Sequence, residues 1–201
     1  MAESESTHLE AIVLAAGAGR RFGGRKLLAV FEGRPLIAGA LDAAFAAPVR
    51  RVRLAIDGDP ELAATARDHA RSLGREGDLE VTAVTDAAEG MGASLRTAVA
   101  ALPADAAGAF VFLGDMPRIP PGLAQALADA LTAGFDLAAP RFEGQRGHPV
   151  LFGRACFPAL LTLEGDAGAR TLLAEAGERL ALVETGDAGV LFDIDRPEDL
   201  A

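Results

Sequence analysis

The chain has 201 residues, half of them hydrophobic, with a single cysteine and a formal net charge of −10. This length and composition can bury one substantial core, so we expect a single domain over residues 9–201 behind a polar tail at residues 1–8. The acidic balance argues against a nucleic acid or an anionic membrane as partner, and one cysteine excludes an internal disulfide framework. The opening MAESESTHLEA is acidic and polar, unlike a signal peptide, and we expect a cytoplasmic protein.

The first half of the chain alternates predicted strands and helices. The apolar run Leu9–Ala15 predicts a short buried strand, and a glycine-rich loop follows it. Pro35 is suited to the first turn of a helix over residues 36–47. The same patterns predict further strands over residues 51–56, 79–84 and 109–113, and helices over residues 61–73 and 91–102.

The second half contains shorter predicted elements. A helix over residues 120–134 opens with prolines and closes at Gly134. The remaining predicted elements are strands over residues 137–139, 150–152, 180–185 and 190–194, and helices over residues 155–163 and 167–177. Strands separated by helices at this spacing predict a mainly parallel sheet covered on both faces. Ligands of such α/β folds lie beyond the carboxyl ends of the strands, so the loops there are the candidate sites.

The loop LAAGAGRRFGGRK, residues 14–26, holds four glycines and four cationic residues. It fails the dinucleotide fingerprint, which needs a third glycine where Phe22 stands, and it fails the NTPase phosphate loop, which needs glycine where Arg25 stands. Four like charges within seven residues repel one another, so an anion-binding loop is favoured over a solvated turn. Lys26 is the only lysine in the chain, and an ammonium differs from a guanidinium in shape and flexibility.

Three later loops carry further candidate groups. In VFLGDMP, Asp115 follows a predicted central strand and a glycine, where a carboxylate can hold a divalent cation. In FDIDRPEDL, Asp195 ends an apolar run before a proline, where a metal ligand and a helix N-cap are both reasonable. In RGHPV, His148 precedes a predicted strand, where it is either a ligand contact or a structural hydrogen-bonding residue.

Together these motifs resemble a known family. L-A-A-G-x-G-x-R-F-G-x-x-K is similar to the signature of nucleotidyltransferases that build activated cofactors and sugars. The pieces EGMGASLR, GDMP, RGHPVLF, GDAGAR and FDIDRPEDL resemble the molybdenum cofactor cytidylyltransferase branch of the molybdopterin nucleotidyltransferase family. The resemblance spans Leu14 to Leu200. It implies a Rossmann-like, three-layer α/β/α fold with a mainly parallel mixed sheet, of the nucleotide-diphospho-sugar transferase type.

The resemblance also implies roles for individual residues. The nucleotide-binding set is Leu14, Ala15, Gly17, Gly19, Arg21, Lys26 and Ser94. The Mg²⁺ ligands are Asp115 and Asp195, and the residues toward the acceptor are His148, Asp166 and Arg170. The groups that carry catalysis are Arg21, Lys26 and Asp115. Two positions depart from the family pattern, because Arg20 stands where serine or threonine is commoner and Gly92 stands where serine is frequent.

The implied reaction joins two anions. A phosphate on the acceptor, molybdopterin in this branch, attacks the α-phosphorus of CTP and displaces pyrophosphate, and Mg²⁺ with Lys26 and Arg21 offsets the repulsion. An ionised phosphate is nucleophilic at neutral pH, which fits a chain without a paired-acid or Ser-His motif. The product would pass to a molybdoenzyme or its maturation factor.

The residues leave three alternatives. Within the same class, the nucleotide is GTP, or the acceptor is a sugar phosphate or another phosphorylated metabolite. A dinucleotide-dependent oxidoreductase would use a similar sheet, but the failed fingerprint and the absence of an acid about 20 residues after the glycines argue against it. A non-catalytic nucleotide-binding protein would keep the loop and lack an acceptor site.

Overall fold

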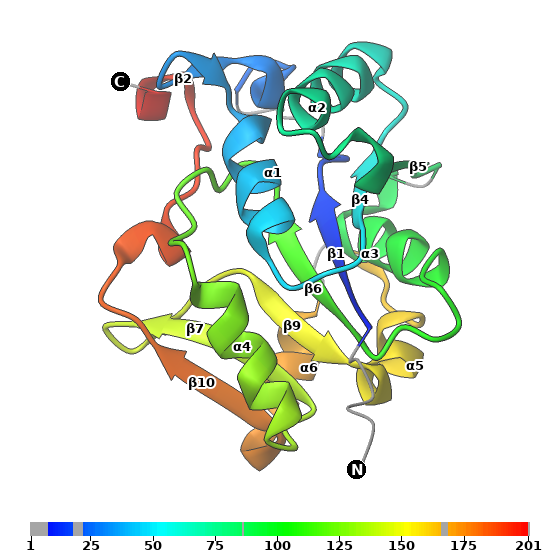
Figure 1. Ribbon diagram of the computed structural model, residues 1–201, viewed down its shortest axis with the longest axis vertical. Helices are drawn as coiled ribbons and strands as arrows, with labels where there is room; N and C mark the ends of the chain where they lie inside the picture. Colours follow the sequence, from blue (N-terminus) through cyan, green and yellow to red (C-terminus); the bar gives the residue numbers. More distant parts are fainter. Residues whose placement is uncertain (1–7, 18–21, 86, 166–168, 201) are drawn as a thin grey trace.

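The computed structural model describes residues 8–17, 22–85, 87–165 and 169–200. Its centre is an eight-stranded sheet in the order β10-β7-β9-β6-β1-β4-β5, with β8 paired to β7 (Figure 1). The strands of this sheet are β1 (Leu9–Leu14), β4 (Val52–Ile56), β5 (Leu79–Ala83), β6 (Gly108–Leu113), β7 (Leu137–Phe142), β8 (Gln145–Arg146), β9 (Val150–Gly153) and β10 (Leu180–Glu184). The pairs β1–β4, β1–β6, β4–β5 and β7–β10 are parallel, whereas β9 runs antiparallel to both neighbours.

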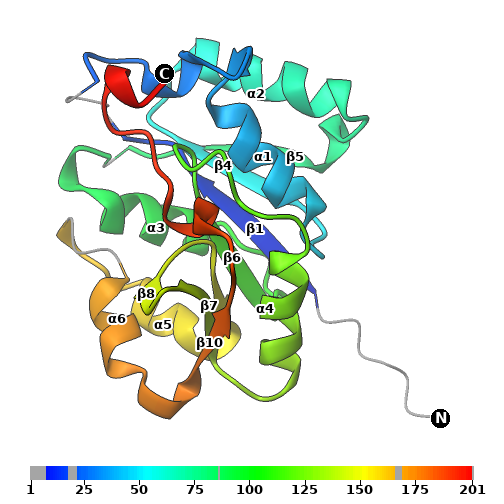
Figure 2. The ribbon, with the colours of Figure 1, turned by 90° about the vertical axis from the view of Figure 1, so that its left-hand side faces the viewer.

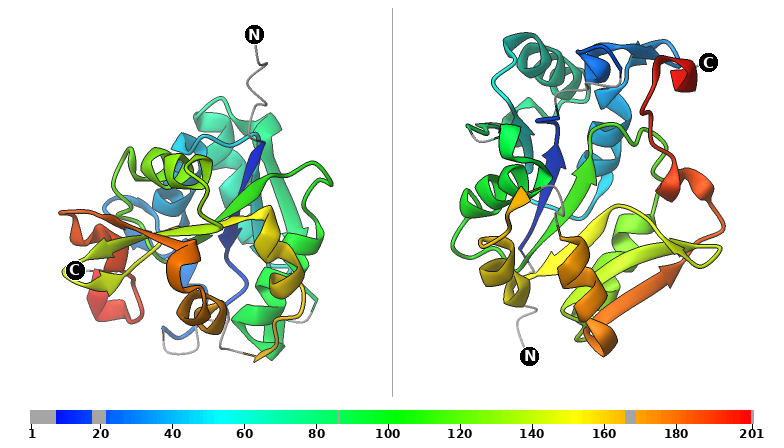
Figure 3. Two further views of the ribbon diagram at one scale, coloured as in Figure 1. Left: turned by 90° about the horizontal axis from the view of Figure 1, so that it is seen from below. Right: turned by 180° about the vertical axis from the view of Figure 1, so that it is seen from behind.

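Helices cover both faces of the sheet. One face packs against α1 (Ile37–Ala46), α2 (Pro60–Ser72) and α4 (Leu123–Thr132), and the other against α3 (Met91–Ala100), α5 (Phe157–Leu160) and α6 (Arg170–Glu175). Figure 1 shows the first group in front of the sheet, and the right-hand view of Figure 3 shows the second. This confirms the predicted three-layer α/β/α arrangement with a mainly parallel mixed sheet. None of the helices in the described part is long and apolar enough to cross a membrane.

Each face of the sheet has its own hydrophobic core, and β1 contributes side chains to both. All six residues of LEAIVL are buried, with Ala11 and Val13 in the core beneath α1 and with Ile12 and Leu14 in the core beneath α3. A strand that is apolar on both sides is typical of a parallel sheet with two covered faces. Cys156 belongs to the second core, where burial raises the pKa of its thiol to about 11.

The chain reverses its direction of progress between β1 and β6. From β1 it moves outward through β4 to β5, and the connection through α3 then brings it back to β6 on the other side of β1. Such a reversal opens a crevice at the carboxyl ends of the two strands, where ligands of open α/β sheets bind. The strand ends are tied together, because the Gly114 N–H donates to the Leu14 carbonyl at 2.9 Å.

The predicted place of Pro35 in the first turn of a helix is wrong, because a short hairpin precedes this helix. Pro35 lies in β3 (Arg34–Pro35), which pairs with β2 (Val30–Phe31), and α1 begins only at Ile37. Glu32 and Gly33 both have positive φ, 49° and 80°, as a two-residue hairpin turn requires. A proline fits the end of such a strand because it needs no amide donor there.

The predicted last strand, residues 190–194, is also wrong. Ala188–Leu191 forms a 3₁₀ turn, and the chain then continues without strand pairing. Its apolar side chains Val190 and Ile194 are fully buried. Their backbone groups bond to loops, because the Val190 carbonyl accepts from the His148 N–H and the Ile194 N–H donates to the Asp115 carbonyl. A short apolar run signals burial without fixing the conformation.

Candidate functional site

The loop after β1 begins where burial ends. Leu14 and Ala15 are buried, and Gly17 is the first exposed residue after the strand. The Ala15 N–H donates to the Ala55 carbonyl at 2.8 Å, so the start of the loop is fixed to β4. The predicted phosphate-binding residues Gly19 and Arg21 lie outside the described residues.

Lys26 contacts the loop at the carboxyl end of β6 through Asp115. Its Nζ lies 2.7 Å from Asp115 Oδ2 and 3.5 Å from Asp195 Oδ1. The three side chains are 12%, 24% and 49% exposed, so the ammonium is the most enclosed of them. The structure thus brings together three predicted site residues that are up to 169 positions apart in the chain.

Tight packing places Asp115 at the end of β6. Gly114 precedes it, and a Cβ at Gly114 would lie 3.0 Å from Ile37 Cδ1 and 3.1 Å from the Leu14 carbonyl oxygen. A larger residue would therefore push the loop away from β1. The backbone carbonyl of Asp115 accepts from the Ile194 N–H at 3.0 Å, which joins this loop to the segment that carries Asp195.

Asp195 was predicted to be either a metal ligand or a helix cap. The 3₁₀ turn Pro197–Leu200 follows it, and Asp199 lies within this turn. Asp199 Oδ2 accepts from the N–H groups of Arg196 and Asp195 at 2.8 and 3.0 Å. The Asp195 carboxylate lies within reach of the Lys26 ammonium, at 3.5 Å.

The donor set fits a divalent cation. Two carboxylates from different loops converge on one positive charge, and oxygen ligands are those that Mg²⁺ prefers. Within the described residues no cluster of three or more His, Cys, Asp or Glu side chains could hold a metal. Mg²⁺ commonly binds one or two carboxylates and takes its other ligands from water and substrate phosphates. Burial raises the pKa of Asp193, and the negative charges of Asp195 and Asp115 nearby add to this effect.

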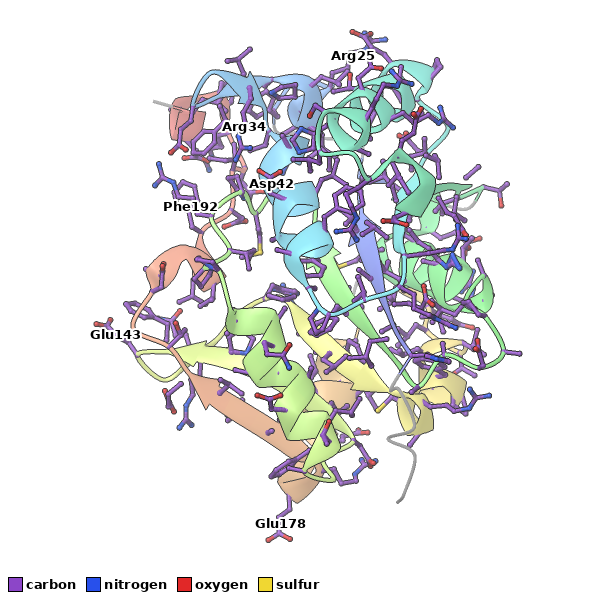
Figure 4. The ribbon with its side chains drawn as sticks, viewed as in Figure 1. Arg25, Arg34, Asp42, Glu143, Glu178 and Phe192 are labelled. Carbon is purple, nitrogen blue, oxygen red and sulfur yellow. The ribbon has the colours of Figure 1, made fainter. Side chains whose placement is uncertain are left out.

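Arg25 faces away from this cluster. Its guanidinium bonds to Glu61 in the first turn of α2, and its Nε lies 4.0 Å from Asp59 Oδ2. Figure 4 shows Arg25 at the outer edge of the molecule beside α2. The two neighbouring cations Arg25 and Lys26 therefore serve different parts of the protein.

Ser94 lies in α3, whose N-terminal end follows Gly90, with φ 115°. Its side chain is buried at 5% exposure. The unusual Gly92 has a structural reason, because a Cβ at this position would lie 2.7 Å from the Gly165 carbonyl oxygen. Serine here would force the 164–165 turn away from the helix.

His148 reaches the site through strand register. Val150 of the antiparallel β9 pairs with Val111 of β6, which brings the residues before β9 to the level of the β6 carboxyl end. His148 is partly buried, and burial, reinforced by Arg146 and Arg170 and opposed by Asp115, lowers the pKa of its imidazole to about 4. The imidazole is therefore neutral at physiological pH and lies close to Asp115.

Two arginines near His148 form no ion pair with any residue that the structure describes. Of the arginines that the structure describes, Arg67, Arg146 and Arg170 form no ion pair or hydrogen bond through their side chains with another described residue. Arg67 lies near Glu76 and lowers the pKa of that carboxyl, whereas Arg146 and Arg170 both lie near His148. Arg146 was part of the motif RGHPV but was not among the predicted site residues. The predicted acceptor residue Asp166 lies outside the described residues.

Comparison with known proteins identifies the family. A model of the MobA-like NTP transferase domain matches residues 11–180. The purine catabolism protein PucB of Bacillus subtilis is 32% identical over 199 residues, which cover 96% of this chain and 95% of that protein. A crystal structure of Rv0371c from Mycobacterium tuberculosis is similar with a TM-score of 0.78, 28% identity and 96% of each chain covered.

Two further structures add to the comparison. Rv0371c is also known in a complex with manganese, at a TM-score of 0.69, 27% identity and 89% of each chain covered. Molybdopterin-guanine dinucleotide biosynthesis protein A of Archaeoglobus fulgidus has a TM-score of 0.61 and 20% identity, over 95% of this chain and 94% of that one, and shows the fold alone. The resemblance to the nucleotidyltransferases is confirmed. The chain belongs to the MobA-like NTP transferase family.

Proposed function

We propose that residues 9–201 form one cytoplasmic nucleotidyltransferase domain that moves CMP from CTP onto the phosphate of molybdopterin and releases pyrophosphate, with Mg²⁺ as cofactor. The observation that carries this proposal is the convergence of Lys26, Asp115 and Asp195 at the carboxyl ends of β1 and β6. A cation and a pair of carboxylates at this place suit a triphosphate and its metal. The manganese complex of Rv0371c supports a divalent metal.

Each group has a distinct task in this proposal. Asp115 and Asp195 would hold Mg²⁺, which supplies a Lewis acid that polarises the phosphates of the nucleotide. Lys26 would place a mobile positive charge beside the triphosphate, and Arg21 would add a second. Leu14, Ala15, Gly17 and Gly19 would bind the nucleotide through their backbone, with Ser94 near its base or ribose.

The residues near His148 support a binding site for the acceptor phosphate. Arg146 and Arg170 carry positive charge that no described carboxylate neutralises, and an acceptor phosphate would do so. His148 lies near these arginines and Asp115 and is neutral, so it can donate or accept a hydrogen bond without adding charge. Arg170, His148 and Asp166 were expected at the acceptor, and Arg146 extends this set. The assignment of molybdopterin and of CTP rests on the motifs EGMGASLR, RGHPVLF and FDIDRPEDL.

Release of pyrophosphate tests the proposal directly. The purified protein is incubated with each of the four NTPs, with and without molybdopterin and with and without Mg²⁺. We expect release with CTP only when both molybdopterin and Mg²⁺ are present. Release with GTP and with none of the other three nucleotides would make the protein a guanylyltransferase. Release with a sugar phosphate in place of molybdopterin would identify a sugar phosphate as the acceptor. Nucleotide binding without pyrophosphate release from any combination would contradict nucleotidyl transfer. If pyrophosphate is released as expected, transfer of the labelled product would identify its recipient, a molybdoenzyme or its maturation factor.

A further inference from the structure

Arg118 joins parts of the chain that lie far apart in sequence. It follows Asp115 by three residues, and its guanidinium carbon lies 4.3 Å from the ring centroid of Phe192 and 5.1 Å from that of Phe31. The two ring centroids are 6.1 Å apart. Arg118 Nη2 also donates to Glu32 Oε1 at 2.7 Å, in the turn of the β2–β3 hairpin. We call Phe31, Glu32, Arg118 and Phe192 the arginine clamp.

The clamp acts on the segment that carries Asp195. We call residues 188–195 the C-terminal arm, which Figure 2 shows running from the end of β10 toward the β2–β3 hairpin. The arm pairs with no described strand. Figure 4 shows Phe192 below the hairpin, and along the chain this residue directly follows the 3₁₀ turn Ala188–Leu191 and precedes Asp195 by three positions. Side-chain contacts and a few loop hydrogen bonds therefore set where Asp195 lies.

The arm also touches the loop of Arg118 through its backbone. A Cβ at Gly189 would lie 1.9 Å from the Arg118 carbonyl oxygen, so only glycine allows this approach. The Ile194 N–H donates to the carbonyl of Asp115 at 3.0 Å. Arg118 thus contacts the arm twice, once through its carbonyl at Gly189 and once through its guanidinium at Phe192.

We propose that Arg118 is a positioning residue, which holds Phe192 against the hairpin and so fixes Asp195 opposite Asp115 across Lys26. An arginine suits this task because its planar guanidinium can stack on a ring and pair with a carboxylate at the same time. Its side chain is 50% exposed, and exposed stacking contacts and ion pairs contribute little to global stability. Removing the guanidinium should therefore loosen the arm more than it destabilises the fold.

Hydrogen exchange tests the placement of the arm without any ligand. In Arg118→Ala, we expect faster exchange of the Ile194 amide and a nearly unchanged melting temperature. Arg141→Ala is the matched control, since Arg141 is a similarly exposed arginine, at 40%, paired with Glu184 between β7 and β10. Unchanged exchange at Ile194, or equal acceleration in the control, would overturn the inference.

Metal binding tests the consequence for the site, which rests on the proposed function. Manganese binding to the protein alone, followed by electron paramagnetic resonance, should weaken about 10-fold in Arg118→Ala, as expected when a group that orients a ligand is lost. Arg118→Lys keeps the charge and loses the planar stack, so its affinity for manganese should lie between those of the unchanged protein and Arg118→Ala. In the Asp195→Asn background, Arg118→Ala should have no further effect, because both changes act through one carboxylate.

The two readouts separate the two claims. If Asp195→Asn binds manganese as well as the unchanged protein does, Asp195 is no metal ligand and that part of the proposed function fails. Faster exchange at Ile194 in Arg118→Ala would still support the positioning role. If Asp195→Asn weakens binding while Arg118→Ala weakens it further in the double variant, Arg118 does not act through Asp195 and the inference fails.

Discussion

Lys26 and Asp115 form an ion pair of 2.7 Å between two loops that are 89 residues apart in the chain. The same ammonium lies 3.5 Å from Asp195, so one positive charge pairs with both carboxylates proposed to hold the metal and offsets only part of their negative charge. A divalent cation on these oxygens would replace Lys26 as their partner. The ammonium, on its flexible four-carbon stem, would then be released toward the phosphates. This exchange predicts competition between Lys26 and the metal.

Removing the charge of Lys26 should affect metal and substrate in opposite directions. In Lys26→Gln we expect tighter manganese binding to the protein alone, because the competing ammonium is gone, and a loss of turnover of at least about 10²-fold, because the triphosphate loses its partner. Electron paramagnetic resonance and pyrophosphate release measure the two effects. Lys26→Arg keeps the charge but changes its shape, and a large loss of turnover there would support a point-charge role. Weaker metal binding in Lys26→Gln would contradict the competition.

Removing the carboxylate of Asp115 should abolish most activity. In Asp115→Ala we expect turnover to fall at least about 10²-fold and manganese binding to weaken, because one of the two converging carboxylates is lost. Asp68→Ala removes an exposed carboxylate that pairs with Arg71 on α2, and it serves as the control. Near-normal Mg²⁺-dependent pyrophosphate release in Asp115→Ala would remove this residue from the mechanism.

Much of this site could be predicted from sequence because strand-end loops meet in a parallel sheet. Lys26 and Asp115 follow β1 and β6, which the structure places side by side. Each motif can be recognised in the sequence by itself, and the fold class predicts that they meet at the carboxyl ends of the strands. His148 of the motif RGHPV lies near the same edge for a related reason. Strand β9 follows it, runs antiparallel to β6 and therefore begins where β6 ends.

Other features depend on contacts that no local pattern encodes. The C-terminal arm has the apolar pattern of a strand, yet Gly189 fits it against the Arg118 carbonyl, and the Val190 carbonyl and the Ile194 N–H bond to loops. The importance of Arg146 appears only when the partners of the other described arginines are known. Pro35 was misplaced for a local reason, because the turn at Glu32–Gly33 is a hairpin signal that a helix-start pattern overlooks.

Charge at Arg146 and Arg170 should govern the acceptor and leave the nucleotide unaffected. In Arg146→Ala and Arg170→Ala we expect KM for the acceptor to rise about 10-fold, since each loses one charge-assisted contact with a phosphate. KM for the NTP should stay unchanged. Initial rates of pyrophosphate release, with one substrate varied at a time, separate the two constants. The control is again Arg141→Ala, whose guanidinium already pairs with Glu184. An equal rise of both constants would contradict an acceptor subsite.

Gly189 should tolerate no side chain. In Gly189→Ala the new Cβ would lie 1.9 Å from the Arg118 carbonyl oxygen and 3.0 Å from Asp187 Oδ1, so backbone must move. We expect the free energy of unfolding to fall by about 1–3 kcal/mol, as overpacking commonly costs, with weaker manganese binding because the arm shifts. Urea denaturation measures the first effect. Gly186→Ala is the control, since a Cβ there meets nothing within 4 Å. Equal stability of the two variants would show that the arm is not fixed at Gly189.

His148 should make the protein sensitive to acid without governing catalysis near neutrality. Burial lowers the pKa of its imidazole from 6.5 to about 4, so the unfolded chain takes up a proton at a higher pH than the folded protein does. The free energy of unfolding should therefore fall as pH drops from 6.5 toward 4, by up to about 3 kcal/mol from this group. Urea denaturation across this range should show the loss in the unchanged protein and a smaller loss in His148→Gln. Between pH 6 and 9 the imidazole stays neutral, and its titration should leave no mark on the rate of pyrophosphate release. An acidic limb near pH 6.5 that disappears in His148→Gln would show instead that the imidazole exchanges protons during turnover.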